Sequence, residues 1–313
     1  MSYNVRSIEQ HIYKIYSKEF AYVYNRSEFL ETITNQNPKL HYLSIGEEKP
    51  RVILFFAEYE NKIIAPFSAP FWNIEKIKKN LSIDIIDEII ASLANYLDSF
   101  KKEIRLTLSP LFYDSDYLTL LLNCFLRNNF KIEYVDINHY IDIRNISIDS
   151  YVDSLAPNAR RNLRIANDLN LAFRRAVSEI EIRKAYEIIS INRSVKGYPL
   201  KLSFEQLRNT LDKIGGDVFL VSENDSFISS AFIFNINLNN KHLIYWGDIP
   251  ESSKTRSMNF LAYKLIEYYK SKSIHFLDLG PSSEKGVPNN GLSNFKESIG
   301  ASVALKPTLV KLK

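Results

Sequence analysis

Three arginines close together in the sequence are the first residues whose type and spacing indicate chemistry. Arg160 and Arg164 are one helical turn apart and share a face, and Arg161 is adjacent. A guanidinium presents a planar fork of N–H donors that matches phosphate or carboxylate oxygens. We therefore expect an anionic ligand here, such as a nucleotide-sugar diphosphate, CoA or the acceptor end of tRNA. The alternative is a solvated helix face whose arginines pair with Asp168 and Glu179.

Lys254 and Arg256 are basic residues at the predicted start of a helix over 255–272. A helix N-terminus carries partial positive charge, so basic side chains beside it favour an anion. The corresponding segment in the first half of the chain, Leu81 to Glu88, carries acids instead. Only the second half is therefore expected to bind a phosphate at this place. Ordinary variation of surface charge is the alternative.

The glycines also direct attention to the second half of the chain, because all nine except Gly46 lie there. Glycine permits unusual backbone angles and the close approach of a ligand. Gly280 and Gly291 flank a loop that follows a predicted strand and opens a predicted helix. Because α/β proteins place ligands at the carboxyl ends of strands, Gly280, Asn290 and Gly291 are candidate substrate-binding residues. Simple turn formation is the alternative.

The composition is that of an ordinary globular protein. The 313 residues are enough for two domains, with 45% hydrophobic and 24% charged residues and a net charge of +4. This charge is below that of a dedicated nucleic-acid binder. No secretory signal or run of about 18 apolar residues is present, so we expect a cytoplasmic protein without a membrane span.

Several other kinds of chemistry are not indicated by the sequence. The single cysteine, Cys124, excludes an internal disulfide and a cysteine-based zinc site. The five histidines show no ligand spacing, so no metal is expected. Phosphate-binding Walker loops, dinucleotide-binding glycine fingerprints and Ser-His-Asp motifs are lacking.

The chain contains a weak internal repeat. Residues 86–110 align without a gap with residues 257–281, and each copy predicts a helix followed by an alternating strand that meets a proline. The same offset continues through a further helix and a final strand. We therefore expect two related domains, 1–147 and 148–313. One continuous sheet over both halves is the alternative.

The pattern of the second half predicts a domain of the α/β (α+β) fold class. Its sheet is expected to be mixed, largely antiparallel and flanked by helices. Its expected elements, in order, are a basic linking helix 148–170, a strand 171–177, helices 179–194 and 204–213, strands 217–222, 227–237 and 241–248, a helix 255–272, a strand 274–279, a helix 288–299 and a strand 302–310.

Two segments of this half resemble the GNAT superfamily. The first is Asn158–Ala166 (NARRNLRIA), which is followed by Leu171–Arg174 (LAFR). The second combines Leu277–Gly280 with Gly291–Gly300 (GLSNFKESIG), and it is similar to the family's closing pattern of a strand, a glycine-containing loop and a Phe-Lys helix. The tandem arrangement resembles the Fem-type peptidoglycan aminoacyltransferases and related tandem GNAT acyltransferases. The resemblance implies two GNAT-like domains, of which the first is a degenerate copy.

The resemblance also implies an activated acyl donor, with acyl-CoA, most simply acetyl-CoA, as the leading expectation. The residues that would bind it lie at the start of helix 255–272: Lys254, Arg256, Ser257 and Asn259. GNAT enzymes hold the CoA pyrophosphate in a Gln/Arg-x-x-Gly-x-Gly/Ala loop, whereas residues 250–259 contain no glycine. Fem-type enzymes use aminoacyl-tRNA and lack this loop, but often carry a charged helical-hairpin arm that this sequence lacks. A binding protein that kept the fold and lost the donor site is the third possibility.

Catalytic candidates follow from the same resemblance. In the family, a lysine after the Phe lies close to the reacting groups, so Lys296 is a candidate for neutralising an oxyanion or steering the acceptor. A surface lysine without a chemical role is the alternative. Transfer to an amine requires removal of a proton, for which Asp248 and Glu284 are candidate bases and Tyr245 a candidate acid.

The expected acceptor is an amine on a small molecule or on a cell-envelope precursor. Lys196 and Tyr198 lie in a predicted loop between helices, where they would form a wall of the acceptor site.

Overall fold

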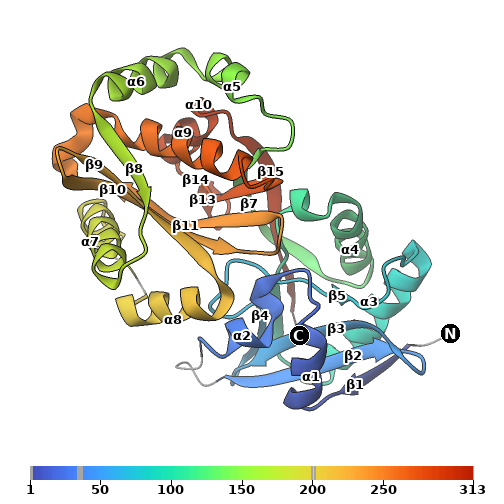
Figure 1. Cartoon of the computed structure of the whole chain (residues 1–313). Coiled ribbons are helices and arrows are strands. Elements are labelled where there is room, and N and C mark those ends of the chain that lie inside the picture. The colour runs from blue at the N-terminus through green and yellow to red at the C-terminus, as the bar shows by residue number, and fades with distance from the viewer. Residues whose placement is uncertain (1–2, 34–37, 199, 201, 313) are drawn as a thin grey trace. The chain divides into compact units, whose positions relative to one another are not determined.

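The computed structural model describes residues 3–33, 38–198, 200 and 202–312, and the chain folds into two compact units (Figure 1). Unit 1 consists of Met1–Ile137, Ser283–Pro288 and Ala304–Lys313, and unit 2 consists of Asn138–Ser282 and Asn289–Val303. These units differ from the division at residue 147 that the repeat predicts, because short segments near the end of the chain group with unit 1.

Unit 1 contains a mixed sheet. Its strands follow the hydrogen-bonded order β1 (Asn4–Ser7), β2 (Lys39–Gly46), β3 (Pro50–Glu58), β4 (Lys62–Ala65) and β6 (Glu103–Thr107), with β5 (Glu75–Lys76) on β3. All of these pairs are antiparallel except β4 with β6. The helical segments are α1 (Gln10–Ser17), η1 (Val23–Asn25), α2 (Ser27–Leu30), α3 (Ile83–Asp98), η3 (Leu111–Tyr113) and α4 (Ser115–Arg127).

Unit 2 contains a similar sheet. Its order is the later half of β7 (Lys131–Asp142), then β12 (Phe276–Pro281), β11 (Asn240–Asp248), β10 (Ser226–Asn235), β9 (Gly216–Glu223) and β8 (Leu171–Arg175). Only β11 and β12 are parallel. The helical segments are α5 (Ile148–Ser154), α6 (Pro157–Asp168), α7 (Glu179–Val195), α8 (Phe204–Ile214), η4 (Pro250–Thr255), α9 (Ser257–Lys270) and α10 (Asn290–Ser298).

Helices cover both faces of the sheet in unit 2 (Figure 1). The Ser230 hydroxyl in β10 donates a 2.8 Å hydrogen bond to the carbonyl of Ala185 in α7. The next residue, Ala231, packs in the apolar core that includes Leu261 and Leu265 of α9. Because successive strand residues face opposite sides of a sheet, α7 and α9 lie on opposite faces. This arrangement is the predicted mixed sheet flanked by helices, so the fold class is confirmed.

Local sequence signals explain where α7 and α8 begin. Ser178 accepts a hydrogen bond from the Glu181 backbone N–H, and the Glu181 side chain accepts from the Ser178 N–H. Ser203 and Gln206 form the same capping box at α8. Each box satisfies two N–H groups that a helix N-terminus leaves free. Both predicted helices, 179–194 and 204–213, are therefore confirmed to within a residue or two.

The expected single helix over 148–170 is wrong. The chain forms α5 and α6 instead, and Pro157 occupies the first turn of α6. Proline has no N–H to donate and forces the residue before it into an extended conformation, which Ala156 adopts with φ −57° and ψ 148°. The proline therefore ends one helix and begins the next.

The repeat is visible in the strand pairing. In each copy, the strand after the long helix pairs in parallel with an earlier strand: β6 with β4, and β12 with β11. The last strand of each copy then pairs in the other unit. The later half of β7 pairs with β12, and β15 (Ser302–Lys311) pairs through its later half with β6. Strands β13 (Ser283–Glu284) and β14 (Val287–Pro288) form a hairpin that groups with unit 1. In the described parts of the chain, no helix is long and apolar enough to cross a membrane.

Candidate active site

The parallel strands β11 and β12 separate near their carboxyl ends. Their pairing covers only Asn240–His242 against Phe276–Asp278, while β11 continues to Asp248 and β12 to Pro281. The register between β10 and β11 also shifts just beyond this point, at Phe232 and Ile233. Such a bulge bends a strand and redirects its side chains. The last paired residues, His242 and Asp278, therefore lie where the two strands part.

Gly280 connects three ionisable side chains at this point. Its N–H donates a 2.7 Å hydrogen bond to Asp278 Oδ1, and its carbonyl accepts a 2.9 Å hydrogen bond from Lys296 Nζ. A Cβ added to Gly280 would lie 3.6 Å from His242 Nε2. Gly280 itself has φ +75°, a conformation that favours glycine. Sequence reasoning predicted Gly280 and Lys296 for the site, and the structure brings them into direct contact.

Lys296 is a buried residue of α10, with 2% of its surface exposed. Its ammonium donates to the carbonyl of Pro281 at 3.0 Å as well as to that of Gly280. The alternative of a surface lysine is therefore wrong. The preceding residue, Phe295, packs its ring against Trp246 of β11 at a centroid distance of 5.4 Å. A cation held in this way costs free energy to bury, so its position requires the carbonyl oxygens around it.

Asp278 and His242 are buried residues that the sequence did not single out. Asp278 is 0% exposed and accepts a 2.7 Å hydrogen bond from the Asn138 side-chain amide. Its other carboxylate oxygen lies 3.8 Å from His242 Nε2. The residues come from β7, β11 and β12, so no spacing in the sequence relates them. One signal was present: Asp278 places a charge between two leucines of a predicted buried strand.

His139 extends the polar cluster toward α10. Its side chain is fully buried, and its Nε2 lies 3.4 Å from both Glu297 Oε1 and Ser293 Oγ. Burial lowers the pKa of His139, and the positive charge of Lys296 lowers it further. The pKa of Glu297 is lowered by hydrogen bonds from Ser293 and His139. Both effects disfavour the protonated form of the His139 imidazole.

A second group of predicted residues meets where the far end of β11 contacts α7. The Asn192 side-chain amide donates to the Asp248 carbonyl at 2.7 Å and to its carboxylate at 3.1 Å. Burial raises the pKa of Asp248, while the charge of Lys196 lowers it. The Arg193 guanidinium carbon lies 5.5 Å from the Tyr245 ring centroid, and burial raises the pKa of Tyr245.

The position of Tyr198 is set by a backbone hydrogen bond. It is exposed just beyond α7, where its N–H donates to the Arg193 carbonyl at 2.9 Å. Asp248, Tyr245, Lys196 and Tyr198 thus gather around one end of α7, apart from the Gly280 cluster.

The start of α9 departs from a typical phosphate-binding loop. Lys254 and Arg256 are exposed, as the sequence predicts for donor-binding residues. Arg256 has φ +57°, the left-handed conformation that a glycine would adopt at lower cost. The Ser257 N–H donates to Thr255 Oγ1 at 3.3 Å, and the Asn259 N–H donates to the Arg256 carbonyl at 3.0 Å. Two N–H groups that would face a pyrophosphate are therefore used within the chain.

The arginines of α6 divide into two kinds. Arg160 donates to the backbone carbonyls of Asp153 and Leu155, so it joins α6 to the end of α5. Arg161 and Arg164 are exposed and form no ion pair within the described residues. The anticipated pairing with Asp168 or Glu179 is thus not formed by either arginine. In β8, by contrast, Arg174 pairs with Glu181 and Arg175 with Asp217, each at 2.7 Å.

The remaining candidates lie near α10. Asn290 and Gly291 are exposed in its first turn, where Asn289 caps the helix by accepting from the Leu292 N–H at 3.0 Å. Glu284 is exposed in β13 and groups with unit 1. Their roles in substrate binding and proton transfer stay predictions.

Unit 1 lacks the counterpart of the buried lysine. The offset of the repeat places Phe125 of α4 at the position of Lys296, and Phe125 is fully buried. Ser109 takes the place of Gly280. An apolar ring cannot stabilise a developing negative charge, so this difference supports the prediction that the first copy is degenerate.

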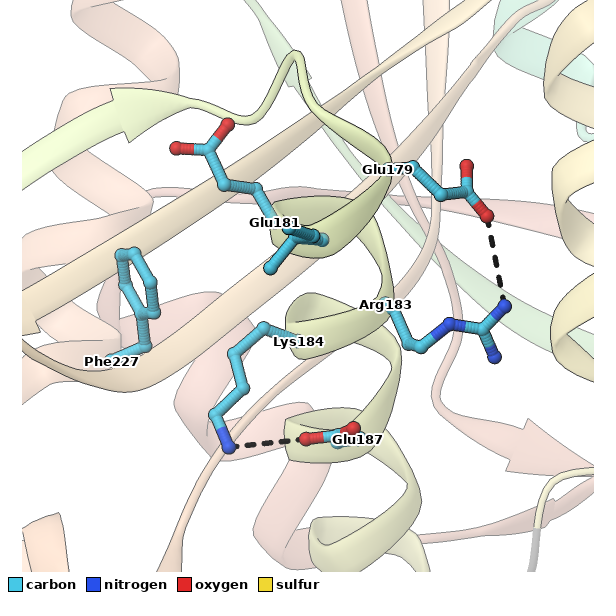
Figure 2. A pocket seen from close by; sticks show the side chains of 7 residues that line it. Glu179, Glu181, Arg183, Lys184, Glu187 and Phe227 are labelled. Carbon is cyan, nitrogen blue, oxygen red and sulfur yellow. Dashed lines mark hydrogen bonds and ion pairs between the residues drawn. The ribbon is translucent and has the colours of Figure 1, made fainter.

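A depression of about 380 Å³ on unit 2 is lined by the first turns of α7 and by Phe227 of β10. Figure 2 shows the side chains that line it. Its charges are already paired, Arg183 with Glu179 at 3.7 Å and Lys184 with Glu187 at 3.0 Å. It contains no residue of the Gly280 cluster, and we assign no ligand to it. Within the described residues, no group of His, Cys, Asp and Glu side chains could hold a metal ion.

Comparisons with known proteins identify the fold. No family model and no curated protein sequence matches the chain. Among solved structures, FemX has a TM-score of 0.70 at 12% identity, over 99% of this chain and 97% of its own. L-PGS from Bacillus licheniformis has a TM-score of 0.62 at 10% identity, over 98% and 93%.

A tandem GNAT protein from the clavulanic acid biosynthesis pathway has a TM-score of 0.54 at 6% identity, over 99% of this chain and 98% of its own. At such identities the likeness shows the fold alone. The chain therefore has a tandem, Fem-like GNAT fold, as the resemblance predicted.

Proposed function

We propose that unit 2 transfers an acyl or aminoacyl group from an activated ester or thioester to an amine. The observation that carries this proposal is the buried Lys296 ammonium, held against the Gly280 and Pro281 carbonyls where β11 and β12 part. Attack by an amine on an acyl carbonyl places negative charge on the carbonyl oxygen. A fixed ammonium in a water-excluded site stabilises that oxygen far more than water would.

The reaction requires no covalent intermediate on the protein. The amine attacks the carbonyl carbon directly, and the bond to the leaving oxygen or sulfur breaks. Lys296 would contact the oxyanion, and the Phe295 and Trp246 rings would line the apolar side of the site. The acceptor that we propose is an amine of a small molecule or of a cell-envelope precursor.

Acyl-CoA is the donor expected of a GNAT fold, but the start of α9 favours aminoacyl-tRNA. A CoA pyrophosphate requires free backbone N–H groups at a helix N-terminus, and those of Ser257 and Asn259 are engaged within the chain. The exposed Arg161 and Arg164 are instead available for phosphates of a longer anionic donor. We therefore propose the aminoacyl ester of tRNA as the donor and acyl-CoA as the second candidate.

A direct test compares the donors on the same protein. Calorimetric titrations with acetyl-CoA, a long-chain acyl-CoA and charged tRNA measure binding. Incubation of each donor with hydroxylamine, a small amine nucleophile, measures transfer as hydroxamate. We expect charged tRNA to bind and to form aminoacyl hydroxamate faster than it does without the protein. Binding and transfer with acyl-CoA alone would support the second donor. If no donor binds or yields hydroxamate, the remaining possibility is a non-catalytic binding protein.

A further inference from the structure

We propose that His242, assisted by Asp278, accepts the proton that the attacking amine loses. This inference rests on the proposed function and assigns a second catalytic role in the same site. The known requirement is general: an amine that has attacked a carbonyl carries a positive charge until a base removes its proton. The base must lie within hydrogen-bonding reach of the nitrogen, and therefore close to the group that holds the carbonyl oxygen.

The geometry around Gly280 supplies such a base. Lys296 Nζ lies 2.9 Å from the Gly280 carbonyl oxygen, and His242 Nε2 lies 3.6 Å from the position of a Cβ on the same residue. The oxyanion-stabilising cation and the imidazole are thus adjacent to one residue of β12. Because Gly280 has no side chain, no Cβ of that residue lies between its backbone and the imidazole.

Asp278 makes the imidazole a stronger base. One carboxylate oxygen is fixed by the Asn138 amide and the Gly280 N–H, each at 2.7 Å. The other lies 3.8 Å from His242 Nε2, which is too long for a hydrogen bond but close enough for a charge interaction with a protonated imidazole. A carboxylate held there stabilises the imidazolium form. It would thereby raise the affinity of His242 for the proton.

The other candidate bases are less well placed. Asp248 follows His242 by six residues of the same strand, which corresponds to about 20 Å in an extended chain. Its carboxylate also accepts from Asn192 on α7. Glu284 is exposed and groups with unit 1. His139 has its Nε2 beside Glu297 and Ser293, so its ring is oriented toward α10.

The proposed step balances in charge and atoms. The amine nitrogen forms a bond to the carbonyl carbon, and its extra proton passes to His242 Nε2. The carbon–oxygen bond to the leaving group then breaks, or the carbon–sulfur bond of a thioester. The imidazolium returns the proton to that leaving atom, so His242 ends the cycle neutral.

The charges around His242 determine how the rate of transfer depends on pH. Asp278 on β12 would stabilise the protonated imidazole, and the Lys296 ammonium of α10, held at the Gly280 carbonyl, would oppose it. On β10, the residue paired with His242 is the apolar Phe234. Transfer should therefore decline below the pKa of His242, because a protonated imidazole cannot accept a proton.

The test uses three variants of the full chain and the hydroxamate assay. His242→Gln keeps a polar side chain but removes the base, and it should lower kcat about 100-fold with little change in the donor KM. Asp278→Asn keeps an acceptor for Asn138 and Gly280, and it should move the acid limb of the kcat profile to lower pH. His275→Gln, at the residue just before β12, is the matched control and should leave both unchanged.

Nuclear magnetic resonance of the histidine rings gives a readout that is independent of turnover. The signal missing in His242→Gln identifies His242, and we expect Asp278→Asn to lower its pKa. If the wild type is active and His242→Gln has the same kcat and pH profile, this inference is overturned and the proposed function stands. An imidazole pKa unaffected by Asp278→Asn would overturn the role of Asp278. A wild type that transfers nothing from any donor would contradict both proposals.

Discussion

The ammonium of Lys296 and the carbonyl of Gly280 are joined by a 2.9 Å hydrogen bond in the interior of unit 2. The two residues come from different elements, one from α10 and the other from the end of β12. The bond places a buried cation at the point where β11 and β12 separate. It also explains why a glycine is required there, because the same residue bends at φ +75° to present its carbonyl.

Gly280→Ala is expected to damage the site through the backbone rather than through crowding. The added Cβ would have 3.6 Å to its nearest neighbour, so the cost comes from the left-handed φ and is about 1 kcal/mol. Gly197→Ala is a matched control, because Gly197 has φ +76° and nothing within 4 Å of an added Cβ. We expect similar losses of thermal stability in both variants, but a loss of hydroxamate formation only in Gly280→Ala. Equal transfer by the two variants would contradict the role of Gly280.

Arg161→Ala and Arg164→Ala are expected to weaken binding of charged tRNA in a salt-dependent way. Each exposed arginine that neutralises a phosphate contributes about 0.7 to 0.9 to the slope of log K against log salt concentration. Binding measured between low and moderate salt should therefore show a shallower slope in each variant. Arg174→Ala is the control, because Arg174 is already paired with Glu181 at 2.7 Å. A slope that changes as much in the control would argue against tRNA contact through α6.

Glu75 in unit 1 is expected to make stability depend on pH. Burial raises its pKa to about 7, despite hydrogen bonds from Asn25 and the backbone of Ala21 and Tyr22. A carboxyl whose pKa is higher in the folded state than in the unfolded state stabilises the fold below the unfolded pKa, and this stability is lost as pH rises through the folded value. The free energy of unfolding should thus fall by about 3 kcal/mol from pH 4.5 to above 7 because of this group.

Chemical denaturation at pH 5 and pH 7.5 measures the contribution of Glu75. Glu75→Gln should remove that part of the pH dependence. Glu58 is the control, because hydrogen bonds from Lys102 and His41 lower its pKa to about 2. Its contribution is present above the unfolded pKa and is lost only as pH falls toward 2, so Glu58→Gln should leave intact the part of the difference between pH 5 and 7.5 that Glu75 causes. An undiminished difference in Glu75→Gln would show that other groups cause it.

Local signals in the sequence predicted most of the elements. The capping residues Ser178 and Ser203 set helix starts, and the alternation around Leu277 and Leu279 predicted β12. The break at Pro157 was also a local signal, but the helical spacing of apolar residues on both sides of it concealed the interruption. The exchange of last strands between the repeats was not predictable in this way, because strand pairing is a non-local choice.

The candidate site was predicted only in part for the same reason. Gly280 and Lys296 belong to a motif within one stretch of sequence, whereas Asn138, His242 and Asp278 meet only through the pairing of three strands. The left-handed backbone conformation of Arg256 was likewise not predictable, because an arginine in the sequence does not indicate a positive φ.

Aminoacyl transfer by Lys296→Met tests whether the buried ammonium stabilises the transition state. Methionine keeps much of the volume of the lysine side chain but removes the ammonium, and Lys296→Arg restores a positive charge. We expect Lys296→Met to bind charged tRNA as the wild type does but to form hydroxamate at least 100-fold more slowly, with partial recovery in Lys296→Arg. Circular dichroism would confirm that each variant is folded. A folded Lys296→Met protein that transfers as fast as the wild type would show that the ammonium has no catalytic role.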